Sequence, residues 1–341
     1  MAGLRGLRLR LVVWGLFLAL AGGTIALMIR MPGRSHAGPL PPLTTHEQSL
    51  RDRLRRHVTI LAGEIGERNL WRPGALESAA KHVEASLGEG GERVVREPFA
   101  VDGREVRNLF VDRPGASRPG EIVVVGGHYD SVLGSPGADD NATGVAAVLE
   151  IARLLAGRRH RRTLRLAAFV NEEPPFFQTE AMGSLRHASD ARSRGEAVVA
   201  MLSLETIGYF SDARGSQNYP PPLGLFYPSR GDFIGFVGNP GSRALVREAI
   251  GSFRRTTAFP SQGAAVPGLL PGVGWSDYWA FWQAGYRAIM VTDTAPFRYP
   301  AYHSPADTPE KVDYDRLARV VAGLARVVEG LAGREEEARN E

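Results

Sequence analysis

Residues 121–128 read Glu121-Ile-Val-Val-Val-Gly-Gly-His128. After its first residue this run is apolar and rich in β-branched side chains, without the alternation of a strand that has one face in water. Such a run is typical of a strand buried on both faces, in a sheet covered by helices. Because His128 stands where the strand ends, we expect a polar side chain at the carboxyl edge of that sheet.

Strand and helix patterns alternate on both sides of this run. Further strands are predicted over residues 94–101, 106–111, 163–170, 197–204 and 286–291. Amphipathic helices are predicted over residues 45–65, 74–87, 142–155 and 314–331. This order predicts an α/β three-layer sandwich, in which a mixed, mostly parallel central sheet is flanked by helices. A single catalytic domain would then cover residues 44–332, followed by a charged tail over residues 333–341.

One segment of this domain departs from the alternating pattern. Residues 208–275 are dense in Gly, Pro, Tyr and Phe. Long segments of this kind in compact domains are usually functional or disordered. We therefore predict a loop-rich insertion that forms a wall or lid of the active site.

Acidic residues follow the predicted strands at their carboxyl ends, where ligands gather in open α/β sheets. Glu172 comes directly after one strand and is followed at once by a second glutamate. Residues of the types that bind divalent metals occur in the order His128, Asp140, Glu173, Glu205 and His303. This mixture of imidazole and carboxylate groups favours zinc, although manganese or cobalt also suits it. Glu172 is then a candidate for the base that takes a proton from metal-activated water, and the pattern predicts a hydrolase.

The N-terminus differs from the rest of the chain. Residues 11–29 carry no charge and are long enough to cross a bilayer as a helix, for which about 20 residues are needed. Arginines in residues 1–10 predict a cytoplasmic N-terminus and an extracytoplasmic catalytic domain. Residues 30–43, rich in Gly, Pro and Ser, are predicted to link this membrane anchor to the domain. The alternative is a signal peptide cleaved after Ser35-His36-Ala37, which would release a secreted protein.

Composition excludes several kinds of chemistry. The chain has no cysteine, so disulfides, thiolate zinc sites and cysteine nucleophiles are absent. The net charge is only +4, and the arginines are scattered among acids. No nucleic-acid partner is expected, because no aromatic interleaving or recognised binding motif accompanies the basic residues.

Four strings together resemble a known family. They are Gly126-Gly-His-Tyr-Asp-Ser131, Gly137-Ala-Asp-Asp-Asn-Ala-Thr-Gly144, Asn171-Glu-Glu173 and Tyr302-His-Ser-Pro-Ala-Asp-Thr308. The strings look like those of the zinc aminopeptidases (co-catalytic metallopeptidases of clan MH), which are related to glutamate carboxypeptidase II and to glutaminyl cyclases. The resemblance covers residues 50–332, in the same order and with plausible spacing.

The resemblance implies a role for each ligand. Asp140 would bridge two zinc ions, with His128 and Glu205 completing one site. Glu173 and His303 would complete the other site. Glu172 looks like the general base, and a cis peptide bond is expected after Asp140. From the residues themselves, Asp130 is placed two positions after His128, where it can accept the second imidazole N–H and fix the tautomer. It is counted with Glu172 among the candidate catalytic residues.

Two positions depart from the family pattern. Many members have aspartate where this chain has Glu205, so one site would need a slightly different strand position. A histidine commonly follows the acid at Asp277, whereas tyrosine follows it here. Asp277 is therefore a candidate support or substrate-pocket residue, and Tyr302 is a second candidate substrate contact.

The implied activity is that of an aminopeptidase, which hydrolyses the first bond of peptides with a free N-terminus through water on a two-zinc site. A glutaminyl-cyclase-like acyltransferase with a single zinc is an alternative. A second alternative is a catalytically silent membrane ectodomain that uses the fold for binding.

Overall fold

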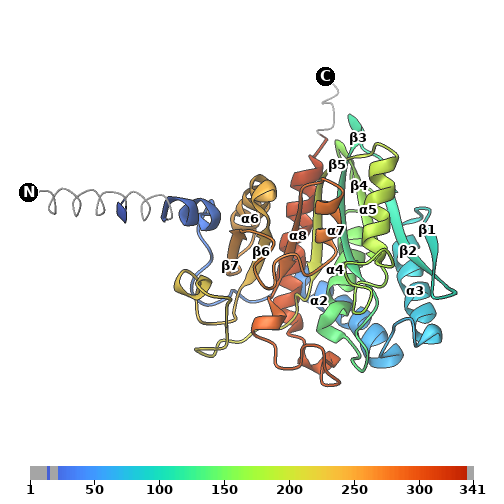
Figure 1. Ribbon diagram of the computed structural model, residues 1–341, viewed down its shortest axis with the longest axis horizontal. Coiled ribbons are helices and arrows are strands. Elements are labelled where there is room, and N and C mark those ends of the chain that lie inside the picture. The colour runs from blue at the N-terminus through green and yellow to red at the C-terminus, as the bar shows by residue number, and fades with distance from the viewer. Residues whose placement is uncertain (1–13, 16–21, 336–341) are drawn as a thin grey trace, which may run out of the picture.

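The computed structural model describes residues 14–15 and 22–335, most of which form one eight-stranded sheet between two layers of helices (Figure 1). The strands are β1 (Val95–Val101), β2 (Arg104–Arg113), β3 (Arg118–His128), β4 (Arg162–Phe169), β5 (Ala197–Glu205), β6 (Ile234–Gly238), β7 (Ser261–Ala265) and β8 (Ala288–Thr292). Their order across the sheet is β1-β2-β4-β3-β5-β8-β6-β7. The central strands β4, β3, β5 and β8 run parallel, whereas β1–β2, β2–β4 and β6–β8 pair antiparallel. The mixed, mostly parallel sheet is therefore confirmed.

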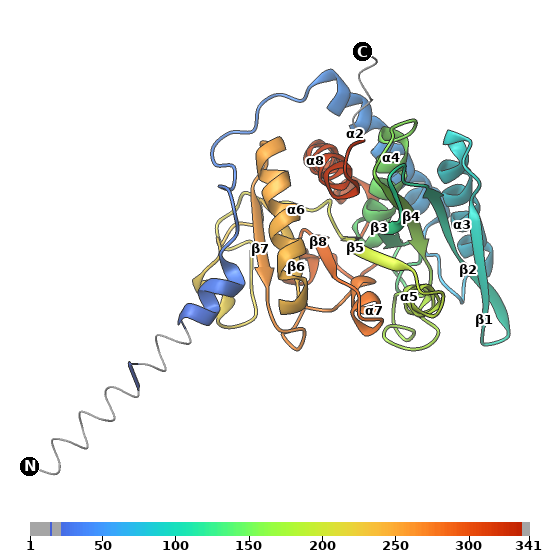
Figure 2. The same cartoon turned by 90° about the horizontal axis from the view of Figure 1, so that it is seen from above.

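Helices cover both faces of the sheet (Figure 2). The helices are α2 (Thr45–Val58), α3 (Pro73–Leu87), α4 (Gly144–Leu154), α5 (Gly183–Ser193), α6 (Arg243–Thr256), α7 (Tyr278–Gln283) and α8 (Tyr314–Ala332). Helices α2, α3, α4, α6 and α8 share one hydrophobic core with the sheet, while α5 and α7 pack on its other face in a smaller core. Val123, Val124 and Val125 of β3 are fully buried between these layers, as a continuous apolar run requires.

Local signals fix the first and last long helices. Thr44 Oγ1 accepts from the Glu47 main-chain N–H at 3.2 Å, and Glu47 Oε2 accepts from the Thr44 N–H at 2.8 Å, which together form a capping box for α2. Asp313 Oδ1 accepts from the Arg316 N–H at 3.0 Å and caps α8. The predicted first helix is also correct in length, because α2 continues as a π-helical turn through Ile65.

The segment predicted as a loop-rich insertion is only partly loop. Its middle part forms β6, α6 and β7, which extend the sheet by two strands. Both strands have only five residues and include glycines, so they lack the long β-branched run that predicts a strand. Loops remain on both sides of these elements, and two of them, residues 215–229 and 266–276, lie beside the site described below.

Residues 30–43 lie against the domain rather than away from it. Arg254 of α6 donates to the Pro32 carbonyl oxygen at 3.0 Å, and the Ser261 N–H donates to Ser35 Oγ at 2.8 Å. A further hydrogen bond joins Arg319 of α8 to the Pro41 carbonyl oxygen. The predicted linker is therefore a strap along the α6 and β7 edge of the body, which both ribbon views show (Figures 1 and 2).

Part of the predicted membrane span, residues 11–13 and 16–21, lies outside the described residues, as does the end of the charged tail, 336–341. Within residues 14–15 and 22–335, no helix has both the length and the apolar character that a bilayer crossing requires.

A buried acid joins the helices α2 and α4. Glu150 is fully buried and accepts hydrogen bonds from Arg53 at 2.8 Å and from Arg153 at 2.7 Å, and its Oε1 lies 3.3 Å from His57 Nε2. Burial alone would raise the pKa of Glu150, but these three hydrogen-bond partners lower it to about 2. Because this folded-state pKa lies below that of an unfolded glutamate, the stabilisation is present above about pH 4.3 and is lost as the pH falls through about 2.

We expect Glu150→Gln to lower the free energy of unfolding at pH 7 by about 2 kcal/mol, because the buried side chain loses its charge-assisted hydrogen bonds from Arg53 and Arg153, whose own side chains are about one third exposed. Urea unfolding at pH 7 and at acid pH measures this effect, and the difference between variant and parent should shrink toward low pH. Glu89→Gln is the matched control: Glu89 pairs with the same Arg53 at 3.1 Å but is half exposed, so its effect should stay within about 0.5 kcal/mol. Equal effects of the two substitutions would contradict the assignment.

Candidate metal centre

The five predicted ligands meet at the carboxyl edge of the parallel strands. His128 ends β3, Glu205 ends β5, and Asp140 lies in the turn of residues 138–143 before α4. Glu173 follows β4, and His303 lies in the loop between β8 and α8. Their ligand atoms form two groups, His128–Asp140–Glu205 and Asp140–Glu173–His303, and within each group these atoms all lie within 4.8 Å of one another. Asp140 is common to both.

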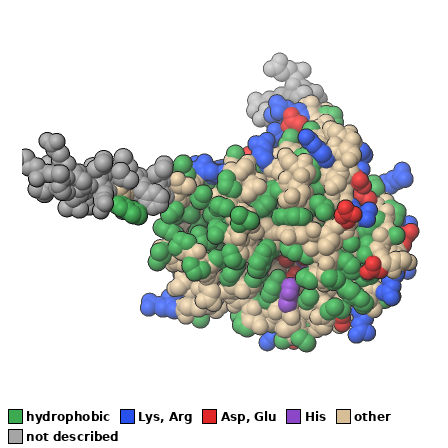
Figure 3. Space-filling model, viewed as in Figure 1, with side chains coloured by type: hydrophobic (Ala, Val, Ile, Leu, Met, Phe, Trp, Pro, Cys, Tyr) green, Lys and Arg blue, Asp and Glu red, His purple; other side chains and the backbone are tan. Residues whose placement is uncertain are grey.

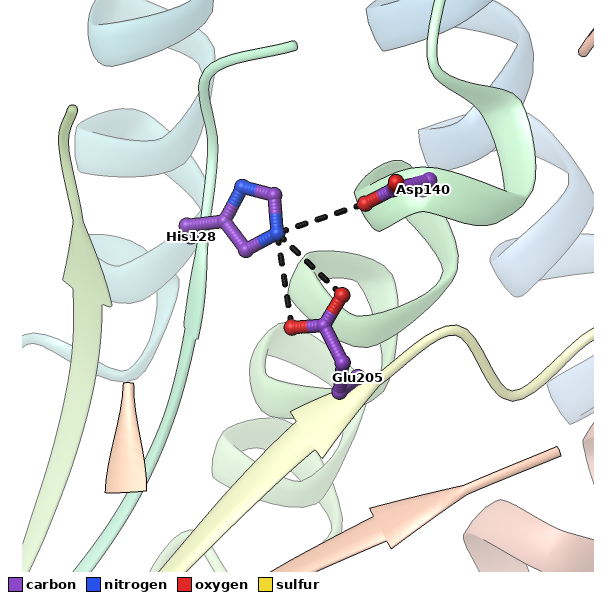
Figure 4. Close-up of side chains that lie close together, drawn as sticks. All are labelled: His128, Asp140 and Glu205. Atoms are coloured by element: carbon purple, nitrogen blue, oxygen red, sulfur yellow. Dashed lines mark hydrogen bonds and ion pairs between the residues drawn. The ribbon is translucent and has the colours of Figure 1, made fainter. Parts of the chain in front are cut away.

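The first group is drawn in Figure 4, where the three side chains point toward one another. His128 Nε2 lies 3.4 Å from Asp140 Oδ1 and 3.4 Å from Glu205 Oε2. In the second group, His303 Nε2 lies 3.0 Å from Asp140 Oδ2 and 3.3 Å from Glu173 Oε2. The two oxygens of Asp140 therefore face the two groups separately, which is the arrangement of a bridging carboxylate.

The donor set fits a pair of divalent cations. Asp140 is buried, and neither of its oxygens has a hydrogen-bond partner among the described residues. Burial and the charge of Asp140 raise the pKa of Glu173 to about 7. Burial also raises the pKa of Glu205 to about 7, although His128 opposes that shift. Buried carboxylates crowded in this way repel one another unless a cation lies between them. His and carboxylate donors match zinc in type.

Glu172 lies beside the first group without belonging to it. Its Oε2 is 3.6 Å from His128 Nε2, and its side chain is 9% exposed. Burial raises the pKa of Glu172 well above its usual range, with His128 opposing the shift and Glu205 and Glu173 reinforcing it. A carboxylate with a raised pKa at the edge of a metal site is suited to accept and return a proton.

Asp130 contacts both His128 and the backbone of the two glutamates. His128 Nδ1 lies 3.2 Å from the main-chain carbonyl oxygen of Asp130, which can only accept, so Nδ1 donates to the carbonyl. The Asp130 carboxylate lies 3.5 Å from the same nitrogen and accepts from the N–H groups of Glu172 and Glu173, each at 3.2 Å. Asp130 is therefore a positioning residue that orders the ring of His128 and the backbone of the two glutamates.

The cis peptide bond expected between Asp140 and Asn141 is present. Asn141 holds the turn in place, since its Oδ1 accepts from the N–H groups of Gly144 and Thr206, both at 3.1 Å. Gly144 has to be glycine, because a Cβ there would lie 2.2 Å from the Leu204 carbonyl oxygen. Thr206 and the ligand His303 have positive φ values of 46° and 54°, a conformation that non-glycine residues adopt rarely and mostly at functional sites.

Three supporting residues were not singled out from the sequence. Ser276 Oγ donates to Glu205 Oε2 at 2.6 Å. The two oxygens of Asp307 accept from the N–H groups of Asp139 at 2.9 Å and Asp140 at 3.1 Å. The sequence marked them only by position, because Ser276 stands next to Asp277 and Asp307 stands four residues after His303.

The third supporting residue, Arg68, is fully buried and clamps the loop between His128 and Asp140. Its guanidinium donates to the main-chain carbonyl oxygens of Tyr129 at 2.7 Å, Pro136 at 2.5 Å and Gly137 at 2.8 Å. Burial lowers the pKa of Arg68 to about 10, although nearby acids including Asp130 oppose the shift. No sequence pattern pointed to this arginine among the many in the chain.

The two predicted substrate contacts, Tyr302 and Asp277, lie in different surroundings. An apolar cavity, partly open to solvent, adjoins the first group and is lined by Tyr302 and Glu205 together with residues of both loops. Tyr302 stacks on His303 with ring centroids 3.9 Å apart. Asp277, in contrast, is completely buried and is not among the residues that line this cavity.

Comparison with known proteins gives the family. Residues 108–328 match the model of peptidase family M28. The chain is 35% identical over 290 residues to uncharacterized protein YfbL of Escherichia coli (strain K12), covering 82% of this chain and 88% of that protein. Among solved structures it resembles BSAP, a zinc aminopeptidase from Bacillus subtilis, with a TM-score of 0.65 at 15% identity over 85% of this chain and 96% of that one. It also resembles the Bacteroides thetaiotaomicron glutaminyl cyclase, with a TM-score of 0.62 at 17% identity over 82% and 97%.

The two structural matches describe the fold alone, because their identities are low. The family match covers more than half of the chain, and the similarity to YfbL spans most of both proteins. The chain therefore belongs to peptidase family M28, which confirms the suspected resemblance and the prediction of a metallopeptidase.

Proposed function

We propose that the protein is a zinc-dependent aminopeptidase that binds two ions and uses Glu172 as its general base. The observation that carries the proposal is Asp140, whose two oxygens each face a separate group of ligands. Zinc held by His128 and Glu205 on one side, and by Glu173 and His303 on the other, would act as a Lewis acid toward the scissile carbonyl and lower the pKa of the attacking water.

The chain's own residues supply the proton transfers. Glu172 is placed to take the proton from the attacking water and to return it to the departing amine. Its main chain is fixed by Asp130, so the carboxylate is held beside the ligands while its side chain keeps a small exposed fraction. The apolar cavity next to Glu205 is suited to an apolar N-terminal side chain.

The test is the metal content of the purified full-length protein, measured by mass spectrometry of the released ions, followed by assays on peptides with free and with acetylated N-termini. We expect two zinc equivalents and cleavage of the free peptides only. Equal cleavage of acetylated peptides would contradict aminopeptidase action. No hydrolysis by fully zinc-loaded protein would favour the silent ectodomain.

A glutaminyl-cyclase-like activity is the second candidate, because a cyclase is among the proteins of similar fold. The presence of two complete ligand groups favours the two-ion hydrolase. A peptide that begins with glutamine separates the two: a cyclase releases ammonia and keeps the chain length, whereas an aminopeptidase releases free glutamine.

Ser276 gives a prediction about one of the two ions. Removing its hydroxyl takes away the hydrogen bond that orients Glu205, so Ser276→Ala should weaken zinc binding at the first group about 10- to 100-fold. Titration with a zinc-buffering chelator would then show one weakened and one unchanged site. Ser203→Ala is the matched control, because Ser203 contacts Ser276 at 2.8 Å and none of the ligands. Two unchanged sites in Ser276→Ala would contradict the assigned role.

We also propose that residues 11–29 anchor the protein in a membrane, with the catalytic domain on the extracytoplasmic side. The uncharged length of the segment and the arginines before it support this orientation. Carbonate extraction of membranes from expressing cells tests the anchor, since a secreted, cleaved product would be found in the soluble fraction.

A further inference from the structure

Two neighbouring loops of the domain are free of charge and expose large apolar side chains. No residue is charged over 215–229 or over 266–276. Leu225 is 82% exposed and Leu269 is 98% exposed, and Phe226 and Trp275 are each more than 40% exposed. Apolar side chains that gather on one surface usually mark an interaction site. Figure 3 shows hydrophobic side chains spread over the part of the body next to the N-terminal segment.

The N-terminal segment packs directly on these loops. Met28 contacts the small apolar cluster of Ala264, Val266 and Val273, against which Tyr227 and Leu270 also pack. Arg243 of α6 donates to the Leu27 carbonyl oxygen at 2.6 Å, and Arg247 donates to the Arg30 carbonyl oxygen at 2.5 Å. The end of the uncharged N-terminal stretch is therefore held at the same side of the domain as the exposed loops.

The chemistry of the loops suits a membrane surface. Tyr219 and Tyr227 stack with ring centroids 5.7 Å apart, and Trp275 lies on the other loop. Tyrosine and tryptophan favour the boundary between lipid headgroups and hydrocarbon. Arg214 and Arg230 flank the first uncharged stretch, and both are exposed, as suits contact with anionic headgroups.

The same two loops wall the apolar cavity at the metal centre. Tyr219 and Tyr227 line it from the first loop, and Pro271 and Trp275, both exposed, line it from the second. We propose that these loops form a bilayer-contacting surface, so that the mouth of the cavity opens at the lipid boundary. An apolar group of a membrane-partitioned peptide would then enter the cavity without passing through water. The orientation of this surface rests on the proposed N-terminal anchor.

The absence of cysteine allows a clean test with single labels. Leu225→Cys and Leu269→Cys, each in the full chain, are labelled with a polarity-sensitive dye. Neither residue lines the cavity. Lys81→Cys is the control, because Lys81 is exposed on α3, which packs on β2 near the opposite edge of the sheet. The proteins are reconstituted in nanodiscs of phosphatidylcholine and phosphatidylglycerol.

We expect the dyes at positions 225 and 269 to shift their emission to the blue, to be quenched by brominated lipid and to be protected from aqueous iodide. The dye at position 81 should show the reverse. Iodide quenching at position 269 equal to that at position 81 would overturn the proposal. If the chain does not enter nanodiscs, the anchor proposal is wrong, and the surface is tested separately. In that case, vesicles of the same two lipids are added to the labelled protein in solution. If the emission of the dye at position 269 does not shift to the blue, the proposed bilayer-contacting surface is wrong.

An activity measurement separates this surface from the proposed reaction. The double variant Leu225→Ser with Leu269→Ser should hydrolyse short water-soluble peptides at the parent rate, but lose activity on peptides carried by vesicles. Failure of the parent on every peptide would overturn the proposed reaction and leave the dye result intact. Equal loss on both kinds of peptide in the double variant would contradict a role in lipid contact.

Discussion

Replacing Glu172 by glutamine should lower kcat by a factor of about 10² to 10⁴ while the zinc content stays at the parent level. The amide has the size of the carboxylate but cannot take a proton from water, and general acid–base catalysis contributes an effect of this magnitude. Metal binding should survive because Glu172 belongs to neither ligand group. Steady-state kinetics on a peptide substrate, with the metal content of the same preparation, measures both quantities.

The matched control for this experiment is Glu180→Gln. Glu180 lies in the same loop after β4 but is exposed to solvent, so its substitution should leave kcat and metal content unchanged. A near-normal rate for Glu172→Gln would refute the base assignment. A loss of zinc from the same variant would instead make Glu172 a ligand.

The second large effect is expected at Asp140. Asp140→Asn should lower the content of both ions and reduce kcat/KM by about a thousandfold or more, because a bound metal ion contributes several kcal/mol to transition-state stabilisation. The reason is geometric, since the two oxygens of Asp140 face His128 and His303 separately. An amide offers only one good oxygen donor and carries no negative charge.

His303→Ala provides the comparison, because His303 belongs to only one group. It should lose about one zinc equivalent and keep the other with His128 and Glu205. Circular dichroism of both variants checks that the fold is retained. Equal metal loss in the two variants would argue against Asp140 as the bridge.

The positions of the ligands could be predicted because each lies close to an element that the sequence marks clearly. The apolar runs before His128, Glu172 and Glu205 are long, so the strands and their carboxyl ends were readable. Parallel strands bring these ends to one edge, which places residues far apart in the chain at one site. The family resemblance added the roles of Asp140 and His303, which no strand pattern supplies.

The extension of the sheet could not be predicted in the same way. Strands β6 and β7 have five residues each and contain glycine. Their apolar residues are too few to mark a strand within a segment that is rich in Gly and Pro. They are strands because β8 offers a free edge: β6 pairs with β8 and β7 pairs with β6. Such pairing depends on tertiary context more than on intrinsic preference.

By itself, the sequence determined the α/β class, the order of the candidate ligands and the presence of Glu172 beside them. Buried strands require apolar residues and metal sites require His, Asp or Glu, so both leave a pattern of residue types along the chain. Tertiary structure alone decided which groups support the ligands and Glu172. Ser276 and Glu205 are 71 residues apart, and Asp307 binds the backbone of Asp139 from 168 residues away. It also decided that residues 30–43 lie on the domain and that two uncharged loops meet the N-terminal segment at the cavity. Hydrogen bonds and packing between distant segments depend on the positions of atoms in space, and local sequence patterns do not encode those positions.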